Sequence, residues 1–391
     1  MELILSSENV VDFLKQQKLC SLDFQPAAPI ACQSGTNFNL VVKSNSGHHF
    51  LVKQNRVDAH GETWGSLPAE WLVQTLIDDF ELSVIQPLVS QVLLLDWSNY
   101  ILVSVFYDNY LALDRFYETR MSFNPQIPRI LGANLAQVHS ATYQQQQQRE
   151  FFGRYFDLDK MSKTPGFIQR LNNLNPNLFG AICPDGLDFY KLYQRFPSLN
   201  LAVLELYEHI QPTCLIHNDL TLNNFIIDEQ IDFDLDSDRV KPEQLKIIDW
   251  ERIIWGDPAV DLGMVVSQYL AIWLNSLVPD SNLELNTILR LAAFPLETIT
   301  PSLKSLLQEY LSHFPSILQH RPDFIRRVVQ FAGIGILDRL SYSVEHHYHF
   351  HNRSLCQLQV AKNLLCHPQQ GIETIFDSTE AELINYPSLA A

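Results

Sequence analysis

Hydrophobic positions change their spacing along the chain, from strand-like runs near the N-terminus to helical periodicity further on. Residues 38–42 and 49–53 form two β-rich runs, and turn residues at 44–47 separate them. Residues 91–107 hold two further apolar runs joined by a polar turn, which is again typical of a hairpin. Between the hairpins, residues 67–80 place apolar side chains at helical spacing. We therefore predict an antiparallel sheet with one key helix.

From about residue 108 onward, helical patterns dominate, including a long one at residues 128–148. Only residues 214–250 return to strand-like runs. The pattern predicts an α+β fold with two lobes: a small antiparallel β lobe at residues 1–107 and a large, mainly helical lobe at residues 108–391. We interpret five consecutive glutamines at 144–148 as the frayed end of a helix rather than an interaction tract.

One strand-like run is interrupted by polar residues that suit a specific chemistry. In the segment CLIHNDLTLNNFIID, two apolar runs flank His217, Asp219 and Asn224. Phosphoryl transfer needs a group that orients the acceptor hydroxyl and oxygen ligands for Mg²⁺, all held by a rigid frame. Asp219 fits the first role and Asn224 the second, while His217 fits a bracing role through hydrogen bonds. A second metal ligand is available in Asp249, which ends the segment LKIID directly after its apolar residues.

Composition narrows the choice of partner. The chain has 27 Lys plus Arg against 44 Asp plus Glu, so its formal charge of −17 opposes binding to nucleic acid or to anionic membranes.

Its six cysteines include no CxxC pair, and we expect buried, reduced thiols. The N-terminus lacks the pattern of a signal peptide, and no apolar run approaches the roughly 18 residues of a membrane span. We expect a cytoplasmic protein.

The sequence resembles the aminoglycoside phosphotransferase and choline kinase group, small-molecule kinases related to the protein kinases. HNDLTLNNF, IIDWE and DPAVDLG, all between residues 214 and 263, look like the catalytic loop, the metal loop and the following helix start of that group. ILGANLAQVHS at 130–140 looks like the preceding helix. The resemblance implies a protein-kinase-like fold and an ATP- and Mg²⁺-dependent reaction. It assigns Asp219 as catalytic base, Asn224 and Asp249 as metal ligands, and Asp261 as a supporting carboxylate. From the residues themselves, Asp257 and Asp261 of DPAVDLG are expected to tie this segment to the His217 loop.

Further matches lie upstream. Lys53 looks like the strand lysine that contacts nucleotide phosphates, and Glu70 like its ion-pair partner. Taken singly, each also fits a solvent-facing charge, and Glu62 is a competing partner for Lys53. The resemblance implies that residues 33–39 form a phosphate-covering turn and that residues 104–107 form the hinge that holds adenine. The implied nucleotide contacts are Lys53, Glu70, Ser34, Gly35, Thr36, Ser104 and Phe106.

The sequence departs from the common pattern in three places. Asn218 stands where glycine is usual, Trp250 and Glu251 follow Asp249, which this group allows but protein kinases do not, and the phosphate turn contains a single glycine, Gly35. Fewer glycines leave fewer backbone N–H groups free to approach phosphate closely.

Three other clusters have an alternative interpretation. Asp232, Asp234, Asp236 and Asp238 resemble a calcium loop but lack its glycine and terminal glutamate, which favours a charged hairpin tip. The group His346, His347, His349 and His351 fits surface polarity, or a metal site in which His347 and His351 share an ion. The aromatic residues Trp255, Tyr269 and Trp273 fit the core, or an aromatic wall for a choline-type substrate.

The combined expectation is an ATP-dependent phosphotransferase that acts on a hydroxyl of a small molecule such as an amino alcohol, a sugar or an aminoglycoside. Two alternatives stay open at this point: a Ser/Thr kinase of a small peptide, and a nucleotide-binding pseudokinase that serves as a scaffold. The sequence identifies neither the acceptor nor the oligomeric state.

Overall fold

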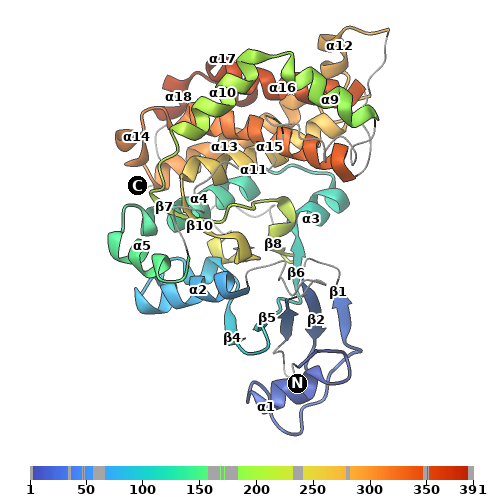
Figure 1. The fold of residues 1–391 in the computed structure, drawn as a ribbon, viewed down its shortest axis with the longest axis vertical. Coiled ribbons are helices and arrows are strands. Elements are labelled where there is room, and N and C mark those ends of the chain that lie inside the picture. The colour runs from blue at the N-terminus through green and yellow to red at the C-terminus, as the bar shows by residue number, and fades with distance from the viewer. Residues whose placement is uncertain are drawn as a thin grey trace. The chain divides into compact units, whose positions relative to one another are not determined.

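The chain forms two compact units (Figure 1). The computed structural model describes residues 3–33, 37–45, 47, 49–55, 67–156, 168, 171, 184–231, 241–278, 282–346, 350 and 352–385. The first unit consists of Met1–Phe116, Asn223–Asp232 and Glu243–Ile253. The second consists of Tyr117–Leu222, Phe233–Pro242 and Ile254–Ala391. The functional lobe boundary after residue 107 stays a prediction.

The first unit contains a five-stranded antiparallel sheet with strand order β1-β2-β3-β5-β4. Its strands are β1 (Ala31–Gln33), β2 (Phe38–Val42), β3 (Phe50–Gln54), β4 (Val92–Asp96) and β5 (Ile101–Val105). Both predicted hairpins are therefore confirmed, and β3 lies in the middle of the sheet, between β2 and β5.

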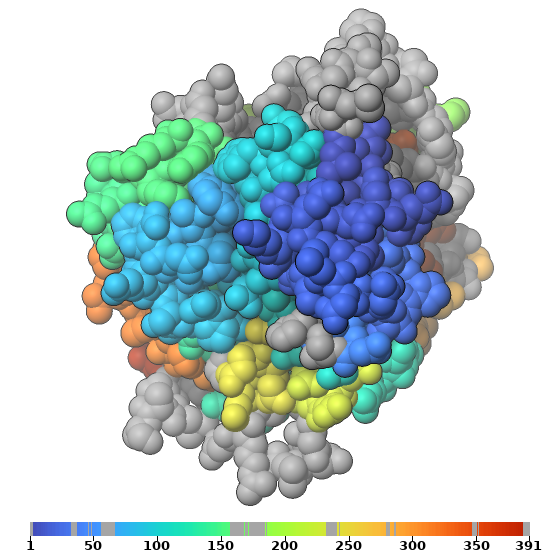
Figure 2. Space-filling view, turned by 90° about the horizontal axis from the view of Figure 1, so that it is seen from below, coloured from blue at the N-terminus to red at the C-terminus, as the bar shows by residue number. Residues whose placement is uncertain are grey.

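The two faces of this sheet are covered by different helices because side chains alternate along each strand. Helix α1 (Val10–Gln16) packs on the face that carries Val52 of β3 and Val103 of β5. Helix α2 (Leu67–Asp79) packs by Leu67 against the opposite face, which carries Leu102. Figure 2 shows residues of the N-terminal segment, in dark blue, covering part of the surface of this unit. Lys53 shares the α2 face, because it is the cross-strand partner of Leu102.

A second sheet of the first unit has three antiparallel strands in the order β6-β8-β9. These are β6 (Tyr110–Ala112), β8 (Phe225–Asp228) and β9 (Leu245–Ile247). A bridge between Val89 and Ile247 connects β9 to the segment that follows α2. The second sheet thus joins a late part of the chain to the N-terminal residues.

The second unit is mainly helical. The helices within its described residues are α4 (Gln126–Thr142), α5 (Gln146–Gly153), α9 (Pro184–Gln194), α10 (Pro197–Glu208), α11 (Pro258–Asn275), α12 (Leu285–Arg290), α13 (Leu296–His313), α14 (Ile317–His320), α15 (Phe324–His346), α16 (Asn352–Cys366), α17 (Pro368–Phe376) and α18 (Glu380–Ile384). Helix α3 (Leu113–Arg120) begins in the first unit and ends in the second. Strand β7 (Cys214–Ile216) pairs with β10 (Ile254–Gly256) in antiparallel fashion. Helices α11, α13 and α15 lie side by side in Figure 1, and α13 also packs against α4. The predicted α+β fold class is confirmed.

The interpretation of the glutamine run was wrong. Helix α4 ends at Thr142, and a new helix, α5, begins at Gln146. Gln144 adopts a left-handed conformation with φ 55°, and its backbone N–H donates to the carbonyl oxygen of Thr213. A tertiary hydrogen bond therefore breaks a stretch that has no helix-breaking residue of its own.

The expectation of buried thiols holds for only part of the set. Cys214 and Cys356 are buried, Cys20 and Cys366 are half-buried, and Cys32 is exposed on the short strand β1. Cys183 lies outside the described residues. An exposed cysteine at position 32 arises because β1 is an edge strand of the sheet.

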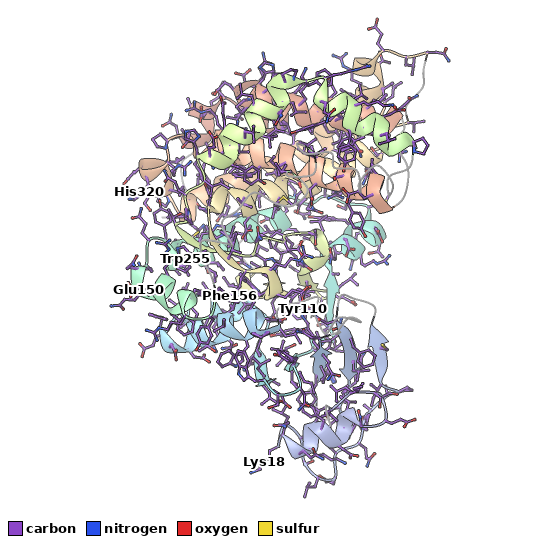
Figure 3. The ribbon with its side chains drawn as sticks, viewed as in Figure 1. Lys18, Tyr110, Glu150, Phe156, Trp255 and His320 are labelled. Carbon is purple, nitrogen blue, oxygen red and sulfur yellow. The ribbon has the colours of Figure 1, made fainter. Side chains whose placement is uncertain are left out.

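The aromatic residues Trp255, Tyr269 and Trp273 belong to the core, each with at most 5% of its surface exposed. Phe152 packs against both Trp255 and Phe156, two residues labelled in Figure 3. The Tyr269 hydroxyl lies 2.7 Å from that of Tyr117. The core interpretation of these aromatic side chains is therefore the one that the structure supports.

Several predicted features lie outside the described residues. These are the aspartate-rich stretch at 232–240, Glu62, and His347, His349 and His351; the side chain of His346 is not described either. Within the described ranges, no group of three or more His, Cys, Asp or Glu side chains is arranged to hold a metal ion. No helix in the described part of the chain has both the length and the apolar character needed to span a membrane.

Helix α4 approaches α13 closely enough that Gly132 has no room for a side chain. A Cβ at this position would lie 2.2 Å from the carbonyl oxygen of Leu306 on α13. We expect Gly132→Ala to lower the free energy of unfolding by about 1–3 kcal/mol, because overpacking against backbone outweighs the gain of roughly 1 kcal/mol in helix propensity. Urea denaturation measures this loss. Gln137→Ala on the same helix is the control and should change stability by less than about 0.5 kcal/mol; equal losses would contradict the packing argument.

Candidate functional site

The first unit buries a lysine between two carboxylates. Lys53 Nζ on β3 lies 2.7 Å from Glu70 Oε2 on α2 and 2.7 Å from Asp249 Oδ1. The exposed fractions of the three side chains are 7%, 2% and 35%. Neither Lys53 nor Glu70 faces solvent, and Glu70 is the partner that the resemblance implied. Glu70 Oε1 also accepts a long hydrogen bond, 3.4 Å, from Ser90 Oγ.

The charge of Lys53 is set by opposing effects. Burial by itself would lower the pKa of this lysine, but the charges of Glu70 and Asp249 and their hydrogen bonds outweigh it. The pKa of Lys53 therefore lies well above the ordinary lysine value. Lys53 consequently stays protonated throughout the physiological pH range, as a fixed positive charge within the site.

A cavity of about 360 Å³ lies beside this lysine. On the sheet side its wall includes Asn39, Leu51, Lys53 and Ser104, which share one face because Leu51 pairs with Ser104 and Asn39 with Lys53 across the strands. The other lining residues are Glu70, Ser90, Val105, Phe106, Tyr107, Tyr110, Ala112, Asn223, Asn224, Ile226, Ile248 and Asp249. All of them belong to the first unit. The cavity combines an apolar wall with a small set of charged and polar groups, as ligand sites do.

The β8–β9 pair brings two oxygen-bearing side chains to one end of the second sheet. Phe225 pairs with Ile247, so Asn224 just before β8 and Asp249 just after β9 emerge at the same end. The backbone N–H of Ile248 donates to the carbonyl oxygen of Asn224 at 2.9 Å, which fixes this end of the pair. Asn224 is buried with 4% of its surface exposed, and both residues line the cavity. Carboxylate and carboxamide oxygens are ligands that suit Mg²⁺.

Asp249 has an unusual backbone. It adopts a left-handed conformation, φ 65° and ψ 53°, directly before the short 3₁₀ helix η5 (Trp250–Arg252). Such a conformation costs roughly 1–2 kcal/mol for a residue that has a Cβ atom. It persists only where the surrounding structure holds it.

In the second unit, the predicted catalytic loop is held by Asp261. The backbone N–H groups of His217 and Asn218 donate to Asp261 Oδ2 and Oδ1, at 2.7 and 2.8 Å. The His217 side chain is fully buried, and Asp261 is almost fully buried near the start of α11. Asp219 itself is half-buried and lies directly after this anchored dipeptide. The role of Asp261 as a support of the loop thus has a concrete geometry.

Two further residues, His139 and Tyr310, form a chain of side-chain contacts that ends on Asp261. His139 on α4 places Nε2 3.3 Å from Asp261 Oδ2 and Nδ1 2.9 Å from the hydroxyl of Tyr310 on α13. His139 and Tyr310 are both fully buried. The neighbouring Asp257 caps α11 through the N–H of Ala259 and pairs with Arg327 at 2.9 Å, so it secures the helix rather than the loop.

The presence of asparagine at position 218, where glycine is usual in the resembling group, has a local explanation. Asn218 has φ 63°, in the left-handed region that glycine adopts without a steric cost. Asparagine is one of the few other residues that adopt this region readily. A residue other than glycine is therefore accommodated here without a change in the loop.

Of the remaining predicted nucleotide contacts, Ser104 and Phe106 line the cavity, whereas Ser34, Gly35 and Thr36 lie outside the described residues. Sequence reasoning missed Ser90 and Tyr110, which also line it; Figure 3 labels Tyr110. Tyr110 follows the hinge on β6 and packs edge to face with Tyr107 at 5.4 Å between ring centroids. No motif marks either residue, because the position of Tyr110 depends on the pairing of β6 with β8, and that of Ser90 on the contact of its segment with Ile247 of β9.

Residues 112–282 match the model of a phosphotransferase enzyme family. This match, which covers less than half of the chain, bears out the predicted resemblance to that group of small-molecule kinases and supports the assignment as a small-molecule phosphotransferase. No curated protein matches the sequence.

Several solved structures are similar to this chain. A choline/ethanolamine kinase family protein from Mesorhizobium loti has 14% identity and a TM-score of 0.48, over 94% of this chain and 99% of that chain. A choline kinase from Streptococcus pneumoniae has 15% identity and a TM-score of 0.43, over 92% and 99%. An ADP-bound aminoglycoside phosphotransferase has 13% identity and a TM-score of 0.47, over 95% and 99%.

The buried lysine allows a test of stability. Lys53→Met leaves the carboxylate of Glu70 buried without its cation, so we expect the free energy of unfolding to fall by about 3 kcal/mol or more. Lys43→Met removes a far more exposed ion pair with Asp108 and should cost less than about 1 kcal/mol. Guanidinium denaturation compares the two. Similar losses in both variants would contradict the energetic role assigned to Lys53.

The raised pKa of Lys53 also predicts how its contribution to stability varies with pH. Because the folded-state pKa of Lys53 is raised, its contribution is fully present below the unfolded pKa of about 10.4 and is lost as the pH rises through the folded-state pKa. The stability difference between the parent protein and Lys53→Met should thus be constant from about pH 6 to 9.

The backbone of the catalytic loop gives a second test. We expect Asn218→Gly to change the free energy of unfolding by less than about 0.5 kcal/mol, whereas Asn218→Val should lower it by about 1–2 kcal/mol. The reason is that a β-branched residue at positive φ is strained, while glycine is not. Thermal unfolding of both variants measures the contrast, and an unaffected valine variant would show that the left-handed conformation is wrong.

Proposed function

We propose that this chain transfers the γ-phosphate of ATP to a hydroxyl group of a small molecule. The observation that carries this proposal is the placement of Lys53 between Glu70 and Asp249 beside a cavity that Asn224 also lines. A buried cation beside two oxygen-bearing side chains suits the binding of phosphates together with a divalent metal ion. The match of residues 112–282 with a phosphotransferase family supports the same reaction.

The cavity fits a nucleotide in size and chemistry. At about 360 Å³ it lies within the range of small-molecule sites, roughly 300–1,000 Å³. Leu51, Ile226 and Ile248 offer apolar surfaces for a base, and residues 104–107, the predicted hinge, line the cavity beside them. Lys53, on the same face of β3 as Leu51, then contacts the phosphates.

Asn224 and Asp249 fit a Mg²⁺ ion bound together with the nucleotide. Mg²⁺ takes one or two protein ligands and completes its coordination with phosphate oxygens and water. When bound, the ion neutralises negative charge that builds up on the phosphates during transfer. In this arrangement Lys53 Nζ lies 2.7 Å from Asp249 Oδ1.

We assign the acceptor side of the reaction to Asp219. Along the chain Asp219 precedes Asn224 by five residues, the separation used by enzymes that orient an acceptor and hold a metal with one loop. Asp219 accepts a hydrogen bond from the acceptor hydroxyl, orients its oxygen toward the phosphorus and takes up its proton late in the transfer. His217 and Asp261 act through the backbone of the loop and do not touch the substrate.

The proposed acceptors are amino alcohols, sugars and aminoglycoside-like compounds. A screen for ATP consumption across these classes, with Ser/Thr peptides included, identifies the acceptor. Turnover with peptides alone would replace the small-molecule assignment with that of a peptide kinase. Mg-ATP binding without turnover of any acceptor would favour a scaffold.

The catalytic assignment is tested by separating binding from turnover. We expect Asp219→Asn to lower kcat by about 10²–10⁴-fold, because a positioned base contributes that much, while the Kd for Mg-ATP changes less than about threefold. Isothermal titration calorimetry and a coupled assay measure the two quantities. Asp188→Asn, an exposed aspartate on α9, is the matched control and should behave like the parent protein. Undiminished turnover of Asp219→Asn would refute the role of Asp219.

A further inference from the structure

A buried hydrogen bond joins two distant parts of the first unit. Asn37 Nδ2 donates to Glu251 Oε2 at 2.8 Å, across 214 positions of the sequence. Asn37 is 3% exposed and Glu251 is 8% exposed. A carboxylate so far from solvent requires a donor in this place, and the pKa of Glu251 is raised chiefly by its burial and then by the charge of Asp249. This contact uses neither of the two carboxylates that pair with Lys53.

The two residues occupy informative positions. Asn37 lies immediately before β2, whereas Glu251 is the central residue of η5, two positions after Asp249. Asp249 is the residue in the left-handed conformation, and η5 begins directly after it. Trp250 anchors the start of η5, because its indole Nε1 donates to the carbonyl oxygen of Ile247 at 3.0 Å. The hydrogen bond from Asn37 then holds Glu251, the residue after Trp250, next to β2 of the first sheet.

We propose that Asn37 and Glu251 form a clamp that holds Asp249 in its left-handed conformation and thereby positions its carboxylate for the metal ion. This inference rests on the proposed function and assigns two positioning residues to the same site. Aspartate is one of the few residues besides glycine that adopt the left-handed region, and the surrounding contacts determine whether it stays there. Ile247 fixes the segment before Asp249 through the β9 pairing, the indole of Trp250 ties the following residue back to Ile247, and the clamp fixes Glu251, two residues after Asp249.

Two observations show that Glu251 acts through Asp249 rather than on a ligand. Asp249 lines the cavity, but Glu251 and Asn37 are not among its lining residues. In addition, Asn37 is neutral, so it satisfies Glu251 without offering a second cation to Asp249. Lys53 then remains paired with Asp249 Oδ1, while Asn37 holds Glu251.

The test compares ATP binding with and without Mg²⁺ in the full-length protein. Isothermal titration calorimetry gives the Kd for ATP in Mg²⁺ and in EDTA for Glu251→Ala, Asn37→Ala, the double variant and Glu251→Gln. We expect each alanine variant to weaken Mg-ATP binding about 10-fold, as loss of a group that orients a metal ligand does, with metal-free ATP binding unchanged within about twofold. The double variant should be no weaker than either single variant, because both remove one contact. Glu251→Gln retains an acceptor for Asn37 and should stay within about threefold of the parent protein.

The outcomes separate the clamp from its rivals. If Glu251 bound the metal directly, Glu251→Gln would lose as much affinity as Glu251→Ala and Asn37→Ala would lose none, which would overturn the proposal. Equal weakening with and without Mg²⁺ would indicate a general loss of structure and would also overturn it. Asn37→Ala supplies the test if Glu251→Ala fails to fold. Glu229→Ala, an exposed glutamate in the same unit, is the control.

The parent protein distinguishes failure of the clamp from failure of the proposed function. If the parent protein binds ATP in a Mg²⁺-dependent way and the variants bind Mg-ATP with the same Kd, the clamp is refuted and the proposed function is not. A parent protein that does not bind Mg-ATP would remove the proposed function, and the clamp with it.

Discussion

The candidate site depends on one electrostatic constraint: a lysine charge buried between two carboxylates. Desolvation opposes the charge of Lys53, and the nearby negative groups Glu70 and Asp249 outweigh it. Those groups come from a helix that follows β3 and from a turn almost two hundred residues later. Satisfying one cation therefore requires β3, α2 and the end of β9 to meet, and this meeting creates the cavity wall.

The fold around this constraint follows from simple patterns in the sequence. Alternation along β3 sends Val52 toward α1 and Lys53 toward α2, so a single strand serves both the core and the site. The hairpins and α2 were predictable from apolar periodicity alone, because each element has one buried face. The break at Gln144 was not predictable, since it depends on a hydrogen bond to Thr213 rather than on local propensity.

The candidate site was only partly accessible to sequence reasoning, for a related reason. Asp219, Asn224 and Asp249 stand out as polar residues within or directly after apolar runs. Tyr110, Ser90 and the contact between Asn37 and Glu251 have no such signal, because each depends on which distant segments pack together. Asn218 was partly accessible to sequence reasoning. The sequence shows that asparagine replaces the usual glycine, but only the structure shows the positive φ that explains why glycine or asparagine is preferred there.

The first unit has a consequence for biosynthesis, because it is assembled from three separate stretches of chain. During translation the five-stranded sheet emerges early, but β8, β9 and Asp249 leave the ribosome only after residues 117–222 have been made. Until then Lys53 and Glu70 lack their third partner, and the cavity lacks one wall. The nascent N-terminal region therefore cannot reach its final form on its own, and a fragment that stops at residue 116 should be an incomplete folding unit.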